Sequence, residues 1–178
     1  SAYRNAWAGY NAVASYDQRS WFRVPSQIVD GALQFGLEPQ HAQMWFAYFE
    51  PYSRERHSAL IAQALAIPGI ELHACGRSLE GRDVELLRVH RHAQASRKVW
   101  IIAQQHPGEH MAEWFMEGVI RRLQDTGDAE MDALLQQADL YLVPNMNPDG
   151  AFRGHLRTNH AGQDLNRAWQ SASSERSP

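Results

Sequence analysis

The sequence has little cysteine, no long apolar run and no excess of one charge, and each absence narrows the possible functions. Cys75 is the single cysteine, which excludes an internal disulfide and leaves no need for an oxidising compartment. No apolar stretch approaches the roughly 18 residues of a membrane span, so we expect no membrane partner. With 17 basic against 20 acidic residues and a net charge of -3, the chain lacks the positive charge typical of nucleic-acid-binding proteins. The first residues do not resemble a signal peptide.

What the sequence does contain is an ordinary globular composition, with 44% of its 178 residues hydrophobic and 21% charged. This length predicts one domain or two small ones. Residues 3–49 are rich in aromatic side chains, and the segments 20–24 and 43–48 have strand character between prolines and glycines. We therefore expect part of an antiparallel β unit over about the first 50 residues.

The pattern changes after Pro51 to an alternation of strands and helices. Ser53 is a suitable N-cap for a helix at 54–66, because its hydroxyl can accept a hydrogen bond from the first turn. The apolar run at 99–103 predicts a strand buried on both faces, and everything from Pro144 onward has loop composition. Further strands are expected at 70–75, 84–90 and 140–143, and further helices at 111–123 and 129–137. The helix at 111–123 has Met111 and Phe115 on its predicted apolar face. This order predicts an α/β fold.

Two side chains that can bind a metal follow the predicted strand at 99–103. His106 and Glu109 lie three residues apart around a Pro-Gly turn. Ligands of open α/β sheets bind at the carboxyl ends of strands, and imidazole nitrogen and carboxylate oxygen are both good zinc ligands. The alternative is a loop histidine beside a glutamate that caps the following helix.

Two more polar segments follow the predicted strand at 140–143. Residues 144–150 contain Asn-Pro-Asp-Gly, which is also simply a good turn. Asn166 and Arg167 could hold a carboxylate, the amide by a hydrogen bond and the guanidinium by a charge-assisted fork, although a solvated loop has the same composition.

Taken together, these segments resemble the zinc carboxypeptidase family typified by carboxypeptidase A. The resemblance covers about residues 43–170, and Trp45–Ser53 is similar to the domain junction of the cytosolic carboxypeptidase branch. The motifs that carry it are Gly76–Asp83, the His-Pro-Gly-Glu at 106–109, the Pro-Asn-Met-Asn-Pro-Asp-Gly at 144–150, Arg157, and the Gly-Gln-Asp-Leu-Asn-Arg at 162–167.

The resemblance implies a fold, a cofactor and a substrate class. It implies an α/β fold: part of a mixed-sheet catalytic domain at residues 51–178, preceded by part of an antiparallel β-sandwich at residues 1–50. It implies a cytoplasmic zinc metallocarboxypeptidase that acts on peptide or protein C-termini, with acidic ends as one possibility. Zn²⁺ is the implied cofactor.

The resemblance also assigns roles to individual residues. His106 and Glu109 match two zinc ligands; carboxypeptidase A is itself the reference example of a two-histidine, one-glutamate site. Asp164 matches the carboxylate that orients the ligand histidine. Asn166 and Arg167 match the pair that binds the substrate C-terminus. Arg157 matches the arginine that stabilises the developing oxyanion. Arg153 is the nearest competitor for that last role.

The sequence departs from the family because no third zinc ligand, general base or substrate-clamping tyrosine follows Arg167. The family takes its third ligand from a downstream histidine, so His110, His155 and His160 are weaker candidates. We therefore expect an internal fragment of a longer enzyme, inactive by itself. The alternatives are a desuccinylase- or aspartoacylase-like zinc amidohydrolase and a catalytically dead binding module.

Overall fold

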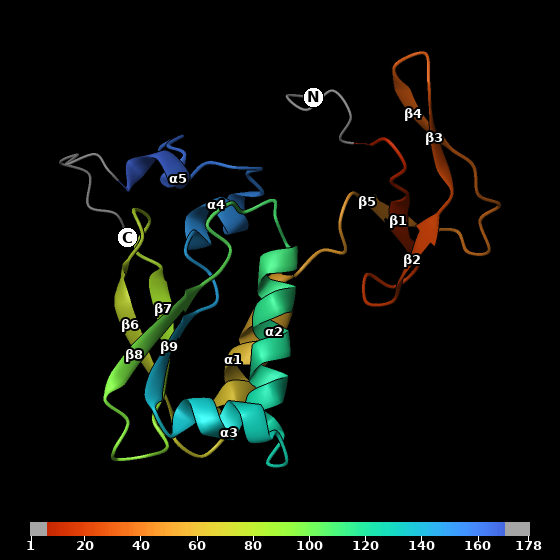
Figure 1. Ribbon diagram of the computed structural model, residues 1–178. Helices are drawn as coiled ribbons and strands as arrows, with labels where there is room; N and C mark the ends of the chain where they lie inside the picture. The colour runs from red at the N-terminus through yellow and green to blue at the C-terminus, as the bar shows by residue number, and fades with distance from the viewer. Residues whose placement is uncertain (1–6, 170–178) are drawn as a thin grey trace. The chain divides into compact units, whose positions relative to one another are not determined.

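The structure, a computed structural model, describes residues 7–169. The chain divides after Pro51 into two compact units, and each is described by itself (Figure 1). Residues 1–6 and 170–178, which belong to the two domains expected from the sequence, lie outside the described part.

The first unit consists of short antiparallel strands. Its three-stranded sheet has the order β2-β1-β5, and β3 pairs with β4 as a separate hairpin. Asp30 and Gly31 turn that hairpin with φ of 50° and 77°, values that suit the Asp-Gly turn of a two-residue hairpin. The strands are β1 (Ala12–Ser15), β2 (Trp21–Val24), β3 (Ser26–Val29), β4 (Ala32–Phe35) and β5 (Trp45–Ala47). The antiparallel pairing confirms the expectation for this part of the chain, although β1, β3 and β4 were not predicted individually.

The second unit is built on a four-stranded mixed sheet in the order β6-β7-β9-β8. β8 and β9 run parallel, and the other two pairs are antiparallel, which confirms the mixed α/β fold. The crossover from β8 to β9 passes through two helices, as a parallel connection requires. The strands are β6 (Ile70–Arg77), β7 (Asp83–Val89), β8 (Arg97–Ile102) and β9 (Ala138–Val143).

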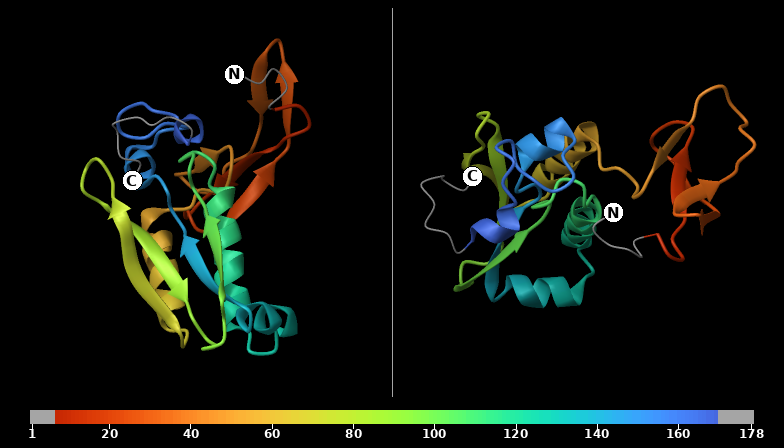
Figure 2. Two further views of the ribbon diagram at one scale, coloured as in Figure 1. Left: turned by 60° about the vertical axis from the view of Figure 1, so that its left-hand side comes forward. Right: turned by 90° about the horizontal axis from the view of Figure 1, so that it is seen from above.

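Helices α1 (Arg54–Leu65) and α2 (Met111–Gln124) pack on one face of this sheet (Figures 1 and 2). Ser53 caps α1 as predicted, because its Oγ accepts a hydrogen bond from the backbone N–H of Arg56. Leu60 of α1, Ile120 of α2 and Leu140 of β9 all lie in the main core and are at most 2% exposed. Helix α3 (Ala129–Leu135) completes the crossover.

Three expectations for the second unit are wrong in detail. β8 is not buried on both faces: Trp100 and Ile102 are 55% and 41% exposed, because β8 forms an edge of the sheet and no described element covers that face. The chain after Pro144 is not all loop, since it forms α4 (Pro148–Arg153) and α5 (Leu165–Ala168). Met111 and Phe115, expected on the apolar face of α2, are exposed.

No helix in residues 7–169 is long and apolar enough to cross a lipid bilayer.

Candidate metal centre

The loop that follows β8 carries His106 and Glu109 and is shaped by backbone contacts. Gln104 begins it in the left-handed region, at φ 53°, and its side-chain amide donates to the carbonyl of Pro107 at 2.6 Å. The N–H of Gly108 donates to the carbonyl of Leu156 at 2.9 Å. Strained backbone of this kind persists where the surrounding structure holds it, often at functional sites.

His106 has both ring nitrogens directed at carboxylates. Its Nδ1 lies 3.4 Å from Oε1 of Glu109, and its Nε2 lies 3.2 Å from Oδ1 of Asp164. The histidine side chain is 12% exposed, whereas that of Glu109 is 52% exposed. A metal-bound histidine commonly gives its second ring nitrogen to a carboxylate, which fixes the ring and its tautomer. This geometry therefore fits His106 and Glu109 as two of the ligands of a zinc ion.

Asp164 connects this histidine to the cationic residues around it. Its Oδ2 accepts a hydrogen bond from Nε of Arg157 at 2.8 Å and lies 3.4 Å from Nε of Arg167. As the N-cap of α5, Asp164 also accepts a hydrogen bond from the backbone N–H of Asn166. The hydrogen bond from Arg157 lowers the pKa of Asp164 below its ordinary value. Burial opposes this shift, and the hydrogen bond with His106 adds to it. An ionised carboxylate is the form that can accept from imidazole and guanidinium together.

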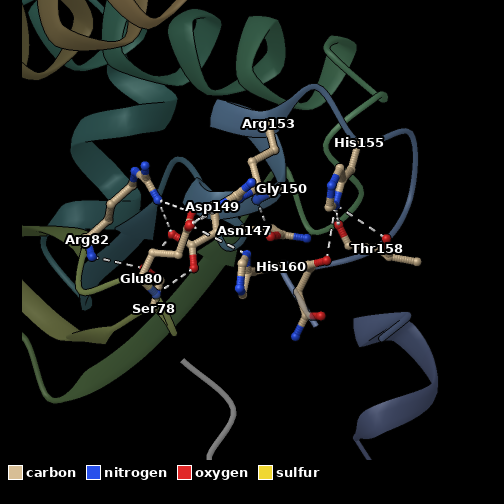
Figure 3. Close-up of polar contacts among 11 residues, drawn as sticks. Ser78, Glu80, Arg82, Asn147, Asp149, Gly150, Arg153, His155, Thr158 and His160 are labelled. Carbon is tan, nitrogen blue, oxygen red and sulfur yellow. Dashed lines mark hydrogen bonds and ion pairs between the residues drawn. The ribbon is translucent and has the colours of Figure 1, made fainter. Parts of the chain in front are cut away.

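The two candidate arginines lie in different clusters. Arg157 contacts Asp164 beside His106, whereas Arg153 at the end of α4 forms an ion pair with Glu80 (Figure 3). The preference for Arg157 over Arg153 thus agrees with the contacts, although its catalytic role stays a prediction.

All six site residues predicted from the sequence lie in the loop after β8, the loop after α4 and the start of α5. His106, Glu109, Asp164, Arg157 and Arg167 are joined by side-chain contacts, and Asn166 joins through its backbone. Arg167 is 83% exposed, so its guanidinium is open to solvent. Trp169 is 63% exposed, and its indole donates a hydrogen bond to the side-chain oxygen of Gln105.

The other histidines near the motifs make different contacts. Nδ1 of His155 faces the carbonyls of Thr158 and Asn159, and Nδ1 of His160 faces Glu80 (Figure 3). Within residues 7–169 there is no cluster of three or more His, Cys, Asp or Glu side chains that could hold a metal ion. The described part of the chain thus contains no complete metal site, and the roles of His106 and Glu109 as zinc ligands stay a prediction.

Two glycines of this region could be recognised only from the structure. A Cβ on Gly108 would lie 2.6 Å from the Leu156 side chain, and one on Gly150 would lie 2.5 Å from Pro107 and 2.6 Å from the carbonyl of Thr158. These glycines let α4 and the loops that carry Pro107 and Thr158 approach one another closely.

Sequence patterns did not predict a charged cluster of His57, Glu85 and Glu113 on the helix side of the sheet. His57 lies between Glu113 of α2, 2.8 Å from its Nδ1, and Glu85 of β7, 2.5 Å from its Nε2. Burial alone would lower the pKa of His57, but the hydrogen bonds that the ring donates to Glu113 and Glu85 raise it to about 9. Burial raises the pKa of Glu113, although the imidazolium opposes that shift. The available sequence signal was the pair of glutamates, Glu113 and Glu117, on the inward face of α2.

This cluster lines a cavity of about 660 Å³ bordered by α1, β7, α2 and α4. Arg54 and Arg82 flank the ring of Phe152 at the cavity, at 5.5 and 4.0 Å from its centroid. His106 and Asp164 do not line it, whereas Gln104 and His110, on either side of His106 and Glu109 in the sequence, do.

Two known protein families together match almost the whole chain. The zinc carboxypeptidase family matches residues 58–177, and the cytosolic carboxypeptidase N-terminal domain matches residues 1–49.

Individual relatives agree with these matches. The solved structure of a metallo-carboxypeptidase from Pseudomonas aeruginosa, in complex with (2-guanidinoethylmercapto)succinic acid, is 66% identical with a TM-score of 0.93, covering 100% of this chain and 48% of that one. The uncharacterized protein ZMO1242 of Zymomonas mobilis is 44% identical over 178 residues, which are 100% of this chain and 46% of that protein. Cytosolic carboxypeptidase 6 of Caenorhabditis elegans is 27% identical over 182 residues, covering 90% of this chain and 39% of the relative. The chain therefore spans about half the length of these relatives or less.

Proposed function

The chain belongs to the zinc carboxypeptidase family, and we propose that the protein carrying it removes C-terminal amino acids from peptides or proteins in a zinc-dependent reaction. The observation that carries this proposal is the arrangement of His106, with one ring nitrogen toward Glu109 and the other held by Asp164. The likeness of the first unit to the cytosolic carboxypeptidase N-terminal domain supports a cytoplasmic location.

In this proposal His106 and Glu109 bind zinc, and a third ligand comes from residues other than the described ones. Zinc in such a site supplies polarisation of the scissile carbonyl and activation of water. Asp164 holds the imidazole of His106 in one orientation and one tautomer, so that Nδ1 stays directed at the metal position.

The cations around Asp164 are proposed to bind the substrate. Arg157 stabilises the negative charge that develops on the carbonyl oxygen, an interaction stronger in the transition state than in the ground state. Asn166 and Arg167 bind the free C-terminal carboxylate, and the exposure of the Arg167 guanidinium supports this role. An internal peptide bond offers no carboxylate to this pair, so the enzyme is an exopeptidase.

We propose further that the enzyme accepts acidic C-terminal residues and that residues 1–178 alone are inactive. The first point is supported only by the resemblance to the cytosolic carboxypeptidase branch. The second is supported by the two-ligand set, because catalytic zinc normally has three protein ligands.

The test uses the full-length protein with zinc and three matched substrate sets. These are peptides ending in a free carboxylate, the same peptides ending in an amide, and N-acyl amino acids. We expect release of the terminal residue from the free acids only, with acidic ends cleaved fastest. We also expect Arg167→Gln to raise KM strongly, whereas Glu130→Gln on the exposed side of α3 leaves it unchanged.

Two outcomes would overturn the proposal. Preferential cleavage of N-acyl amino acids would indicate a zinc amidohydrolase instead. Tight zinc binding without hydrolysis of any set would indicate a binding module.

A further inference from the structure

Glu80 occupies the turn between β6 and β7 and contacts two arginines and a histidine. Its carboxylate lies 2.6 Å from Nη1 of Arg82, forms an ion pair with Arg153, and lies 3.5 Å from Nδ1 of His160 (Figure 3). Its side chain is 20% exposed. The bond from Arg153, followed by that from Arg82, lowers the pKa of Glu80 to about 2, so the carboxylate is ionised at neutral pH.

Arg153 and His160 stand on either side of Arg157 in the sequence, four residues before it and three after it. Because both contact the same carboxylate, Glu80 closes residues 153–160 into a loop. Inside this loop the ring of His155 faces the carbonyls of Thr158 and Asn159. A closed loop restricts the directions in which the Arg157 side chain can leave the backbone.

The turn that carries Glu80 is itself held by a buried carboxylate. Asp149, 3% exposed at the start of α4, accepts hydrogen bonds from the hydroxyl of Ser78 at 2.7 Å and the backbone N–H of Glu80 at 3.0 Å. It also accepts from Nη1 of Arg82 at 2.6 Å. Asp149 thus holds the turn that carries Glu80 against the start of α4. A displacement of the Glu80 carboxylate would therefore displace residues 153–160.

We infer that Glu80 is a positioning residue for Arg157, acting through Arg153 and His160 rather than by touching the substrate. This inference rests on the role proposed above for Arg157. If Arg157 acts in the transition state, a loosened loop reduces kcat and leaves substrate binding by Asn166 and Arg167 nearly unchanged.

The experiment is a double-mutant cycle in the full-length, zinc-loaded protein. Glu80→Gln, Arg157→Gln and the double variant are compared by kcat and KM on a peptide with a free C-terminus. Asp83→Asn is the matched control, because Asp83 lies on the adjoining strand and pairs with the exposed Arg77. Thermal unfolding of each variant checks that it folds.

We expect Glu80→Gln to lower kcat about tenfold, since displacements of about 1 Å at a reacting group can cost as much as a hundredfold. KM should change less than kcat, and the control should match the unmodified protein. In the Arg157→Gln background Glu80→Gln should have no further effect, because its action passes through Arg157. Should Glu80→Gln fail to fold, Glu80→Asp enters the same cycle, since its shorter side chain cannot reach both Arg153 and His160.

Equal losses from Glu80→Gln in both backgrounds, or an unchanged kcat, would overturn the inference while leaving the proposed function intact. An unchanged kcat in Arg157→Gln alone would overturn both the proposed role of Arg157 and the inference.

Discussion

Replacing His57 with glutamine removes a positive charge that two carboxylates share within the second unit. His57 on α1 connects to Glu113 on α2 and to Glu85 on β7, so three elements of the unit meet at one ring. An ionised carboxylate only accepts hydrogen bonds, so the imidazole must carry both protons to satisfy both partners. Glutamine keeps the possibility of one hydrogen bond but leaves Glu113, whose side chain is 3% exposed, without its counter-charge.

The magnitude follows from two independent arguments. Breaking a buried ion pair by removal of one partner costs about 3–5 kcal/mol. A rise in the pKa of His57 from its ordinary 6.5 to about 9 corresponds to about 3 kcal/mol of stabilisation of the protonated form. We therefore expect His57→Gln to lower the free energy of unfolding by about 3 kcal/mol near pH 6.

The pH dependence has a definite sign. Below about pH 6.5 the imidazole is protonated in the folded and in the unfolded chain, and the full stabilisation is present. As the pH rises from there through about 9, the folded protein has to release a proton that the unfolded chain has already lost. The stability difference between the unmodified chain and His57→Gln should therefore shrink across this range.

The assay is urea unfolding followed by the helical circular dichroism signal. All helices among residues 7–169 lie after Pro51, so within that part this signal reports the second unit. His73→Gln is the matched control, because His73 on β6 is 50% exposed and pairs with the exposed Glu71. A loss below about 1 kcal/mol for His57→Gln, or a stability difference that grows with pH, would refute the reasoning.

Two further predictions concern the candidate metal centre. Gly108→Ala should weaken zinc binding by the full-length protein about tenfold, because the added Cβ would displace the loop that carries Leu156. Competition with a chelator measures this affinity. Gly118→Ala is the control and should leave zinc binding unchanged, because nothing lies within 4 Å of the added Cβ. Residues 1–178 alone should bind zinc weakly in a titration, and His106→Ala should abolish that binding, because two ligands hold the ion poorly. Tight one-to-one binding by residues 1–178 would contradict this expectation.

The elements that sequence patterns predicted correctly are those governed by local rules. The helix after Ser53 begins with a side-chain cap, and β9 carries an apolar segment at 140–143 that is buried except at Tyr141, which is half-buried. β8 carries a similar apolar segment at 99–102 but lies at an edge, and a local pattern carries no information about which neighbours a strand will have.

Other misses arose from partners distant in the sequence. Glu113 and Glu117 face inward on α2 because His57 and Arg56 of α1 supply their counter-charges, and these pairs are 56 and 61 residues apart.

The start of α4 was missed although its signal is local. Asn147 begins α4 by accepting a hydrogen bond from Gly150, with Pro148 at the first helical position. An asparagine followed by proline is a helix-start signal as well as a turn signal, and it could have been interpreted so.

The candidate site could not be assembled from local rules at all. His106 and Asp164 are 58 residues apart, and only the resemblance placed them together. Glu80 lies in the Gly76–Asp83 motif, and nothing in that motif indicates that its side chain contacts residues on both sides of Arg157.

The position of β9 between β7 and β8 has a consequence for how this protein is made. Within residues 7–169, β8 forms its strand hydrogen bonds with β9 alone, although β9 is synthesised some 40 residues later. On the ribosome, the loop with His106 and Glu109 emerges while β8 still has no strand beside it. We therefore expect the candidate metal centre to form only after β9 has inserted into the sheet, so that zinc binding would report a correctly ordered sheet.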